Sequence, residues 1–208
     1  QGRIAADNIC GGDSRYAGTQ GSAILKAFDM AVAATGLNET AAKAAGIDYD
    51  KTYLYAPSHA SYYPGGSGLS LKILWEKESG RLLGAQLLGF EGVDKRMDVL
   101  ATALRLGAKV TDLVSLELCY APPFASAMDV INAAGNVADN VVSGYHNAIT
   151  PDEFVDLWEK RDENNYLFVD IRPAKAGKPI EERHPGQSLS LPLEEFNARA
   201  AKEIPADR

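Results

Sequence analysis

Cysteine is scarce in this chain: Cys10 and Cys119 are the only two among 208 residues, and they lie far apart in the sequence. This spacing forms neither the disulfide framework of a small secreted protein nor a Cys-x-x-Cys metal site. We therefore expect a reducing compartment, the cytoplasm. Cys119 has no Lys, Arg or His beside it to favour a thiolate, so we expect a buried apolar residue rather than a reactive thiol.

Basic charge and long apolar runs are lacking as well. The 21 Lys and Arg face 28 Asp and Glu, which gives a net charge of −7 and a pI near 5.0. The sequence thus offers no basic surface to nucleic acid, and no apolar run approaches the ~20 residues that span a bilayer. A composition of 46% hydrophobic and 24% charged residues is typical of a soluble globular protein with one large or two small domains.

Familiar catalytic and phosphate-binding motifs are missing too. The sequence contains no nucleophile elbow, no cluster of metal ligands, no complete dinucleotide fingerprint and no Walker loop. The glycine-rich stretch 11–21 is read as a linker, and PGGSG at 64–68 as a flexible loop between strands. His59, His146 and His184 are scattered, so we expect surface residues and no metal site.

Both ends of the sequence look cut. QGRIAADNI at the start has helical composition but no cap and no signal-peptide pattern, and EIPADR at the other end stops where a strand would follow. The hypothesis is that the chain is a piece of a longer protein.

The residues that are present indicate a mixed α+β fold. LSLKILWEK alternates Leu69, Leu71, Ile73 and Trp75 with polar partners, ESGR turns and RLLGAQLLGF returns, which predicts an antiparallel hairpin. A strand is expected over 52–56. Helices are expected over 40–45, where the sequon-like Asn38-Glu-Thr40 serves as a cap, and over 93–106, 111–118 (with Thr111 as N-cap) and 125–142. Lys95 is expected on the outward face of its helix, and the wide apolar face of the last helix suggests a partner chain.

Residues 22–34 fit two structures. Apolar side chains recur at helical intervals at Ile24, Leu25, Phe28 and Val32, and Gly36 offers a stop, which predicts an amphipathic helix. An alanine-rich strand is the alternative.

The sequence after residue 146 reads as a separate unit. Thr150 as N-cap, Pro151 at the first position and the acidic residues after it predict a helix start. NYLFVDIRP then reads as a buried strand, 174–186 as a loop and 192–204 as a helix. A strand followed by a helix predicts the opening of a parallel α/β unit.

Three tyrosines stand out as candidates for chemistry. Tyr62 and Tyr63 precede a Pro-Gly-Gly turn. One alanine separates Tyr120 from the rigid pair Pro122-Pro123. A phenol held on rigid backbone can donate a proton or hydrogen bond to a thiolate or flavin. The alternative is a core aromatic residue with a satisfied hydroxyl.

Several segments together resemble a known family. QGRIAADNI, YAGTQGSAILKAFDMAVAATGLNE, RLLGAQLLGFEGVDKRMDVLATAL and LELCYAPPFASAMDVINAAGNVADN resemble the C-terminal end of flavin-dependent pyridine nucleotide-disulfide oxidoreductases. The similarity is greatest to the group of coenzyme A-disulfide and NADH-dependent persulfide reductases, and it covers Gln1 to Val142. It implies that residues 1–12 end a helix of the FAD domain. Residues 13–146 would form the dimerisation domain, an antiparallel sheet with helices.

The resemblance also implies a site and its partners. CYAPPF resembles the coenzyme A-disulfide branch, where two tyrosines of one subunit reach the redox cysteine and flavin of the other subunit. On that pattern the catalytic residues are Tyr120 and Tyr62, with Tyr63 as the alternative to Tyr62, while Ala121, Pro122 and Phe124 lie against the cofactor. The intact enzyme would be a homodimer that uses FAD and NAD(P)H on a coenzyme A disulfide or persulfide. This chain alone is expected to be inactive and to bind no cofactor tightly.

Two other functions stay open. One is an NADH oxidase or peroxidase of the same superfamily, whose acceptor is oxygen or peroxide. The other is a non-catalytic dimerisation or interaction module.

Residues 147–208 resemble the beginning of a rhodanese domain. The similarity rests on ITPDEF, LFVDIR, HPG and SLPLEEF. AKAGKPIEERHPG departs from the Glu-Phe/Tyr-x-x-Gly-His loop that is usual in rhodanese domains. Neither Cys10 nor Cys119 lies where the sulfur-carrying cysteine of such a domain belongs. Asp170 and Arg172 are then expected to pair structurally in an incomplete α/β rhodanese-like domain.

Overall fold

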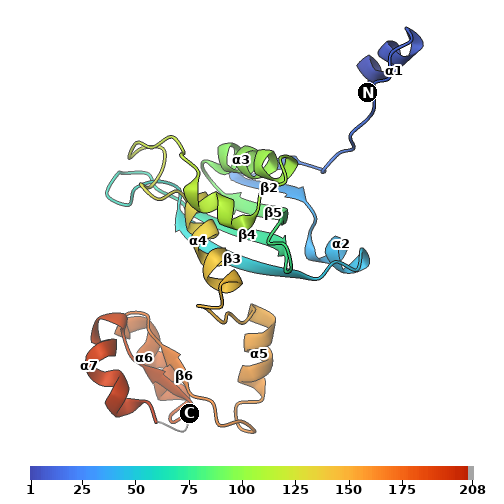
Figure 1. The fold of residues 1–208 in the computed structure, drawn as a ribbon. Coiled ribbons are helices and arrows are strands. Elements are labelled where there is room, and N and C mark those ends of the chain that lie inside the picture. The colour runs from blue at the N-terminus through green and yellow to red at the C-terminus, as the bar shows by residue number, and fades with distance from the viewer. Residues whose placement is uncertain (206–208) are drawn as a thin grey trace. The chain divides into compact units, whose positions relative to one another are not determined.

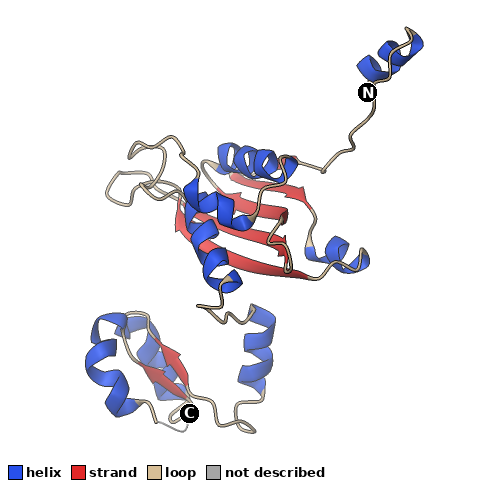
Figure 2. Ribbon diagram, viewed as in Figure 1, coloured by secondary structure: helices blue, strands red, loops and turns tan. Residues whose placement is uncertain are grey.

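The structure is a computed structural model that describes residues 1–205, so the last three residues of the expected second domain lie outside it (Figures 1 and 2). The chain divides into two compact units, Gln1–Asn147 and a second that begins at Ala148. The first unit comprises α1 (Gly2–Ile9), β1 (Ala23–Ala27), β2 (Met30–Gly36), α2 (Glu39–Ala44), β3 (Tyr49–Pro57), β4 (Gly68–Glu76), β5 (Leu82–Gly89), α3 (Val93–Arg105), the 3₁₀ helix η1 (Val110–Ser115) and α4 (Val130–Val142).

The first unit is built on a five-stranded antiparallel sheet with strand order β1-β2-β5-β4-β3. The alternating pattern that predicted the central hairpin is confirmed: Leu71 of β4 pairs with Leu87 of β5, and both are buried. Figure 2 shows α3 and α4 beside the sheet, and both helices contact its strands. Met97 and Leu100 of α3 and Ile131 of α4 complete the core on that face.

The helix expected over 22–34 is wrong, and the alternative holds. β1 and β2 form a hairpin with the register Ile24↔Ala33, and the turn places Phe28 at a φ of 54°. β2 then pairs with β5, and Ala33, opposite Leu87, packs into the core. Of the apolar residues at helical intervals, Ile24, Leu25 and Val32 therefore lie on strands and Phe28 in the turn between them, because pairing with a distant strand decides the conformation.

Two helix boundaries also differ from the prediction. The helix expected from 125 begins only at Val130, because the Asp129 side chain accepts a hydrogen bond from the Ile131 N–H and caps it there. The helix expected over 111–118 is a 3₁₀ helix that ends at Ser115, and Thr111 lies inside it rather than at its cap. Helix α2 matches its prediction, since the Asn38 side chain accepts a hydrogen bond from the Ala41 N–H.

The second unit contains a parallel pair of short strands with helices. Its elements are α5 (Pro151–Glu159), β6 (Phe168–Asp170), α6 (Ala174–Arg183), β7 (Ser188–Ser190) and α7 (Leu193–Glu203). The predicted start of α5 is confirmed: Thr150 accepts from the Glu153 N–H, and Pro151 is the first helical residue. The strand expected in 165–173 forms, but its side chains are half-buried.

The loop expected over 174–186 is wrong, because most of it is helix α6. Gly177 and Pro179 read as helix breakers, yet both lie inside the helix. Gly177 approaches β7 so closely that a Cβ there would lie 2.5 Å from Ser190 Oγ. The glycine thus serves contact between helix and strand rather than a turn.

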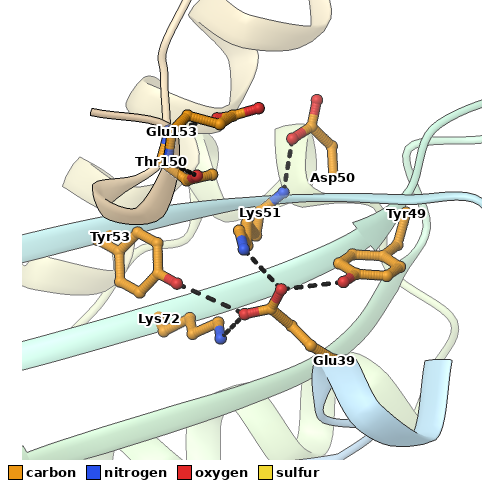
Figure 3. A network of polar contacts seen from close by, with 8 residues as sticks. All are labelled: Glu39, Tyr49, Asp50, Lys51, Tyr53, Lys72, Thr150 and Glu153. Carbon is orange, nitrogen blue, oxygen red and sulfur yellow. Dashed lines mark hydrogen bonds and ion pairs between the residues drawn. The ribbon is translucent and has the colours of Figure 1, made fainter. Parts of the chain in front are cut away.

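A polar cluster on β3, β4 and α2 holds one half-buried carboxylate, that of Glu39 (Figure 3). Glu39 accepts hydrogen bonds from Lys51 Nζ at 2.5 Å, from Tyr49 Oη at 2.9 Å and from Lys72 Nζ. Burial disfavours the ionised form, but the hydrogen bonds from Lys51, Lys72 and Tyr49 outweigh it and lower the pKa of Glu39 from 4.5 to about 2. The carboxylate therefore ties α2 to the two strands.

This cluster predicts acid sensitivity of the first unit. Because the pKa of Glu39 is lowered in the folded state, its contribution to the free energy of unfolding is complete above pH 4.5 and is lost as the pH falls toward 2. In Glu39→Gln, we expect a less stable protein at pH 7 and a smaller loss of stability between pH 4.5 and 3. Urea unfolding at a series of pH values measures both. Glu91→Gln, an exposed site with the same charge change, should keep the wild-type acid dependence.

Candidate functional site

Two of the candidate tyrosines meet at the surface of the first unit. Tyr62 lies in the loop between β3 and β4, and Tyr120 lies in the segment between η1 and α4. Their hydroxyl oxygens are 3.2 Å apart although 58 residues separate them in the sequence. The side chains are 75% and 49% exposed, so both phenols are accessible and neither is the satisfied core residue of the alternative interpretation.

Tyr63, the alternative to Tyr62, points elsewhere. Its ring packs edge-on against His59, with centroids 5.7 Å apart. The structure therefore brings Tyr62, and not Tyr63, to Tyr120.

The loop that carries Tyr62 is closed at its base by hydrogen bonds. The Ser58 N–H donates to the Ser67 carbonyl at 2.7 Å, and the Ser67 N–H donates to Ser58 Oγ at 3.1 Å. His59, expected on the surface, is 4% exposed, and its Nδ1 lies 3.1 Å from the Ala60 carbonyl. The expectation of a surface residue is therefore wrong. The loop folds back over the His59 ring and has a small core of its own. His146 is exposed, as predicted, and His184 is half-buried against Trp158.

The loop that carries Tyr120 is held by prolines and a turn. The N–H groups of Phe124 and Ala125 both donate to the Ala121 carbonyl, at 2.9 and 3.1 Å. Ala121 and Pro122 are half-buried, whereas Phe124 is 69% exposed. Cys119 is exposed rather than buried, which corrects the prediction. The extended backbone before Tyr120 runs along the surface and turns this side chain outward.

The first turn of α3 contacts both loops. Arg96 is 2% exposed; it forms an ion pair with Asp129 at 2.8 Å and donates from Nη2 to the Ser58 carbonyl at 2.8 Å. Lys95, expected to face away from the structure, donates from Nζ to the Phe124 carbonyl at 2.8 Å. Sequence reasoning missed both roles. The available signal was that Arg96 occupies a position on the apolar stripe of α3, three residues after Val93 and four before Leu100.

The surroundings of Tyr120 favour its neutral form. The hydrogen bond with Tyr62, and to a smaller extent burial, raises the pKa of Tyr120 above its ordinary value of 10.0. Tyr120 is therefore a hydrogen-bond donor at neutral pH, not a base. Burial, followed by the charge of Arg96, lowers the pKa of Lys95.

The two segments that carry the pair contain further exposed apolar residues. Tyr63, Phe124 and Met128 are each more than 40% exposed beside it in the sequence, while Val130, Ile131, Ala134 and Ala138 of α4 are buried in their own unit. Within residues 1–205, no three His, Cys, Asp or Glu side chains gather as metal ligands, and no described helix is long and apolar enough to cross a membrane. The described residues thus offer two adjacent, exposed phenols at the surface of the first unit.

Fold and site together define an α+β domain that presents paired tyrosines on its surface. The profile of the family "pyridine nucleotide-disulphide oxidoreductase, dimerisation domain" matches residues 22–131, just over half of the chain. The chain belongs to this family.

The proteins to which this chain is similar include reductases of coenzyme A disulfide and of persulfide. The coenzyme A disulfide reductase of Staphylococcus epidermidis is 39% identical over 133 residues, which are 64% of this chain and 30% of the relative. The crystal structure of reduced Bacillus anthracis CoADR-RHD is 40% identical with a TM-score of 0.87, and the match covers 100% of this chain and 36% of that one. An NAD-dependent persulfide reductase from A. fulgidus is 35% identical with a TM-score of 0.82, again over 100% and 36%. The chain therefore spans about a third of the length of these relatives.

Proposed function

We propose that this chain is the dimerisation part of an FAD- and NAD(P)H-dependent reductase of coenzyme A disulfides or persulfides, and that Tyr62 and Tyr120 of one subunit act in the active site of the other. The observation that carries the proposal is the exposed pair of phenols, 3.2 Å apart, in a chain similar to reductases of both kinds. The flavin and nicotinamide, held by other parts of the longer protein, would supply the electrons.

The two phenols together can donate a hydrogen bond to an anionic sulfur. One hydroxyl can donate to the other, which leaves a second O–H free to donate to an anionic sulfur. A hydrogen bond to a charged group contributes about 1.5–3 kcal/mol, more than a neutral one. Tyr62 and Tyr120 would steady the thiolate of a redox cysteine or protonate the sulfur that leaves the substrate. The raised pKa of Tyr120 supports the role of a donor.

The surroundings of the pair support an interface. Tyr62, Phe124 and Met128 are 75%, 69% and 58% exposed, which is costly in water unless another surface covers them. We propose a homodimer in which Ala121, Pro122 and Phe124, held by the Pro122-Pro123 backbone, lie against the partner's flavin. Both cysteines of the described chain are free, which is consistent with a reducing cytoplasm.

The second unit is proposed to begin a rhodanese-like domain. Two findings support this: the match to Bacillus anthracis CoADR-RHD covers the whole chain, and the unit contains a parallel strand pair with helices. Asp170 binds the Arg172 guanidinium at 2.6 Å and the Arg172 N–H at 3.0 Å. This pairing supports a structural role for both residues.

Substitution of the tyrosines in the longer reductase tests the function. In Tyr120→Phe and Tyr62→Phe, we expect kcat/KM for coenzyme A disulfide to fall about tenfold each, because a donor to an anionic sulfur is lost. The double variant should lose little more than the stronger single one, since the two phenols act as a pair. Tyr63→Phe, which leaves the pair intact, should stay close to wild type.

Mixed dimers test whether the tyrosines act across the interface. One subunit lacks the redox cysteine and the other carries Tyr120→Phe. If Tyr120 serves the partner, this dimer keeps one complete site and about half of the activity, whereas a dimer with both changes in one subunit keeps none that is complete. The opposite result, or wild-type turnover in both tyrosine variants, would refute the proposal.

A further inference from the structure

The first turn of α3 lies where the two tyrosine loops come together. Arg96, buried on this turn, uses its guanidinium on several partners. Nε and Nη2 bind the Asp129 carboxylate at 2.8–3.1 Å, Nη1 donates to the Gly92 carbonyl at 3.0 Å, and Nη2 donates to the Ser58 carbonyl at 2.8 Å. Ser58 is the base of the Tyr62 loop, and Asp129 ends the Tyr120 loop. One side chain therefore binds an end of each loop.

The neighbouring residue fixes the middle of the second loop. Lys95 Nζ lies 2.8 Å from the carbonyl oxygen of Phe124, four residues after Tyr120. That carbonyl belongs to the turn in which the Ala121 carbonyl accepts two backbone N–H groups. Lys95 and Arg96 thus set where the Tyr120 segment lies relative to the Tyr62 loop.

We propose that Lys95 and Arg96 are positioning residues, which hold the two loops so that the hydroxyl groups of Tyr62 and Tyr120 meet. That this geometry matters for turnover rests on the proposed function; the positioning itself does not.

Stability alone is a weak reason for this arrangement. Well-packed apolar residues often replace a buried ion pair with no loss of stability. Arg96 instead donates hydrogen bonds to the backbone of the Tyr62 loop and to the residue that caps α4. Its planar guanidinium fixes the direction of these hydrogen bonds as well as their length. Neither phenol is held by burial, since the two side chains are largely exposed. Their meeting therefore depends on the loop backbones, and those depend on α3.

Lys95→Met tests the proposal in the 208-residue chain, because this side chain is at the surface and its loss leaves Arg96 and Asp129 paired. Heteronuclear NMR of tyrosine labelled at its ζ carbon follows the ionisation of Tyr120, which is assigned with Tyr120→Phe. In Tyr62→Phe, the pKa of Tyr120 should fall because its hydrogen-bond partner is gone. We expect the same downward shift in Lys95→Met, and loss of the through-space cross-peak between the two rings.

Arg105→Met is the matched control, since it removes an exposed cation from the other end of the same helix. It should leave both signals unchanged. Arg96→Lys, which keeps the charge but not the fork, should resemble Lys95→Met. If Lys95→Met retains the wild-type shift and cross-peak, the proposal is overturned. Since neither signal depends on catalysis, inactive tyrosines would refute the proposed function and leave this inference standing.

Discussion

Replacing Arg96 with methionine is expected to lower the free energy of unfolding of the first unit by about 3–5 kcal/mol. The Asp129 carboxylate is 5% exposed and would remain buried without its cation. The Ser58 and Gly92 carbonyls would each lose a donor as well. Removing one partner of a buried pair costs far more than the pair itself contributes, because the remaining charge keeps its desolvation penalty.

The two tryptophans allow this effect to be assigned to one unit. Trp75 is buried in the core of the first unit, and Trp158 lies in the second. In a Trp158→Phe background, urea unfolding followed by tryptophan fluorescence therefore reports on the first unit alone. Arg105→Met, in the same background, should change the free energy of unfolding by well under 1 kcal/mol.

A second variant separates charge from packing. Arg96→Met combined with Asp129→Asn removes the unpaired charge, while asparagine can still cap α4. We expect the double variant to recover part of the stability that Arg96→Met loses, with a clear departure from additivity. A single variant within 1 kcal/mol of wild type would show that the ion pair does not hold the loops.

The sequence predicts correctly those elements whose pattern of apolar and polar residues fits only one kind of secondary structure. The apolar residues of β4 alternate from Leu69 to Ile73, and Thr150-Pro151 begins α5 through local hydrogen bonds alone. Residues 22–34 have two compatible periods, and only pairing with β5, about fifty residues later, selects the strand. In the same way Gly177 reads as a breaker until β7 is packed against it.

The site was predictable only in part. The resemblance to a family selected Tyr62 and Tyr120 as candidates, whereas their 3.2 Å approach is a product of long-range packing. Arg96 reads in the sequence as one more charge on a helix. Its place on the apolar stripe of α3 indicates burial, but its role depends on Ser58 and Asp129, which lie 38 and 33 residues away, so its partners cannot be read from the local pattern.

Gly84→Ala is expected to destabilise the first unit by about 3 kcal/mol. Gly84 lies in β5 between Gly36 of β2 and Leu74 of β4, and the chain leaving β2 crosses directly over it. A Cβ would lie 2.1 Å from the Leu37 carbonyl oxygen and 2.6 Å from its nitrogen. Both atoms are backbone, and the Leu37 N–H is hydrogen-bonded to the Leu83 carbonyl at 2.9 Å, so neither can move without breaking the junction of the two strands.

Gly68→Ala is the control for this variant, because it adds the same methyl group to the neighbouring strand, where no atom lies within 4 Å. Alanine is favoured over glycine within a strand by roughly 0.5–1 kcal/mol, so Gly68→Ala should be neutral or slightly stabilising. The fluorescence assay in the Trp158→Phe background measures both. Equal effects of the two substitutions would mean that the crossing of Leu37 over β5 can relax, and that the sheet is less tightly joined at β2 and β5 than the contacts indicate. A large difference would instead place the lost stability at that crossing, because the two variants differ only in what the new methyl group meets.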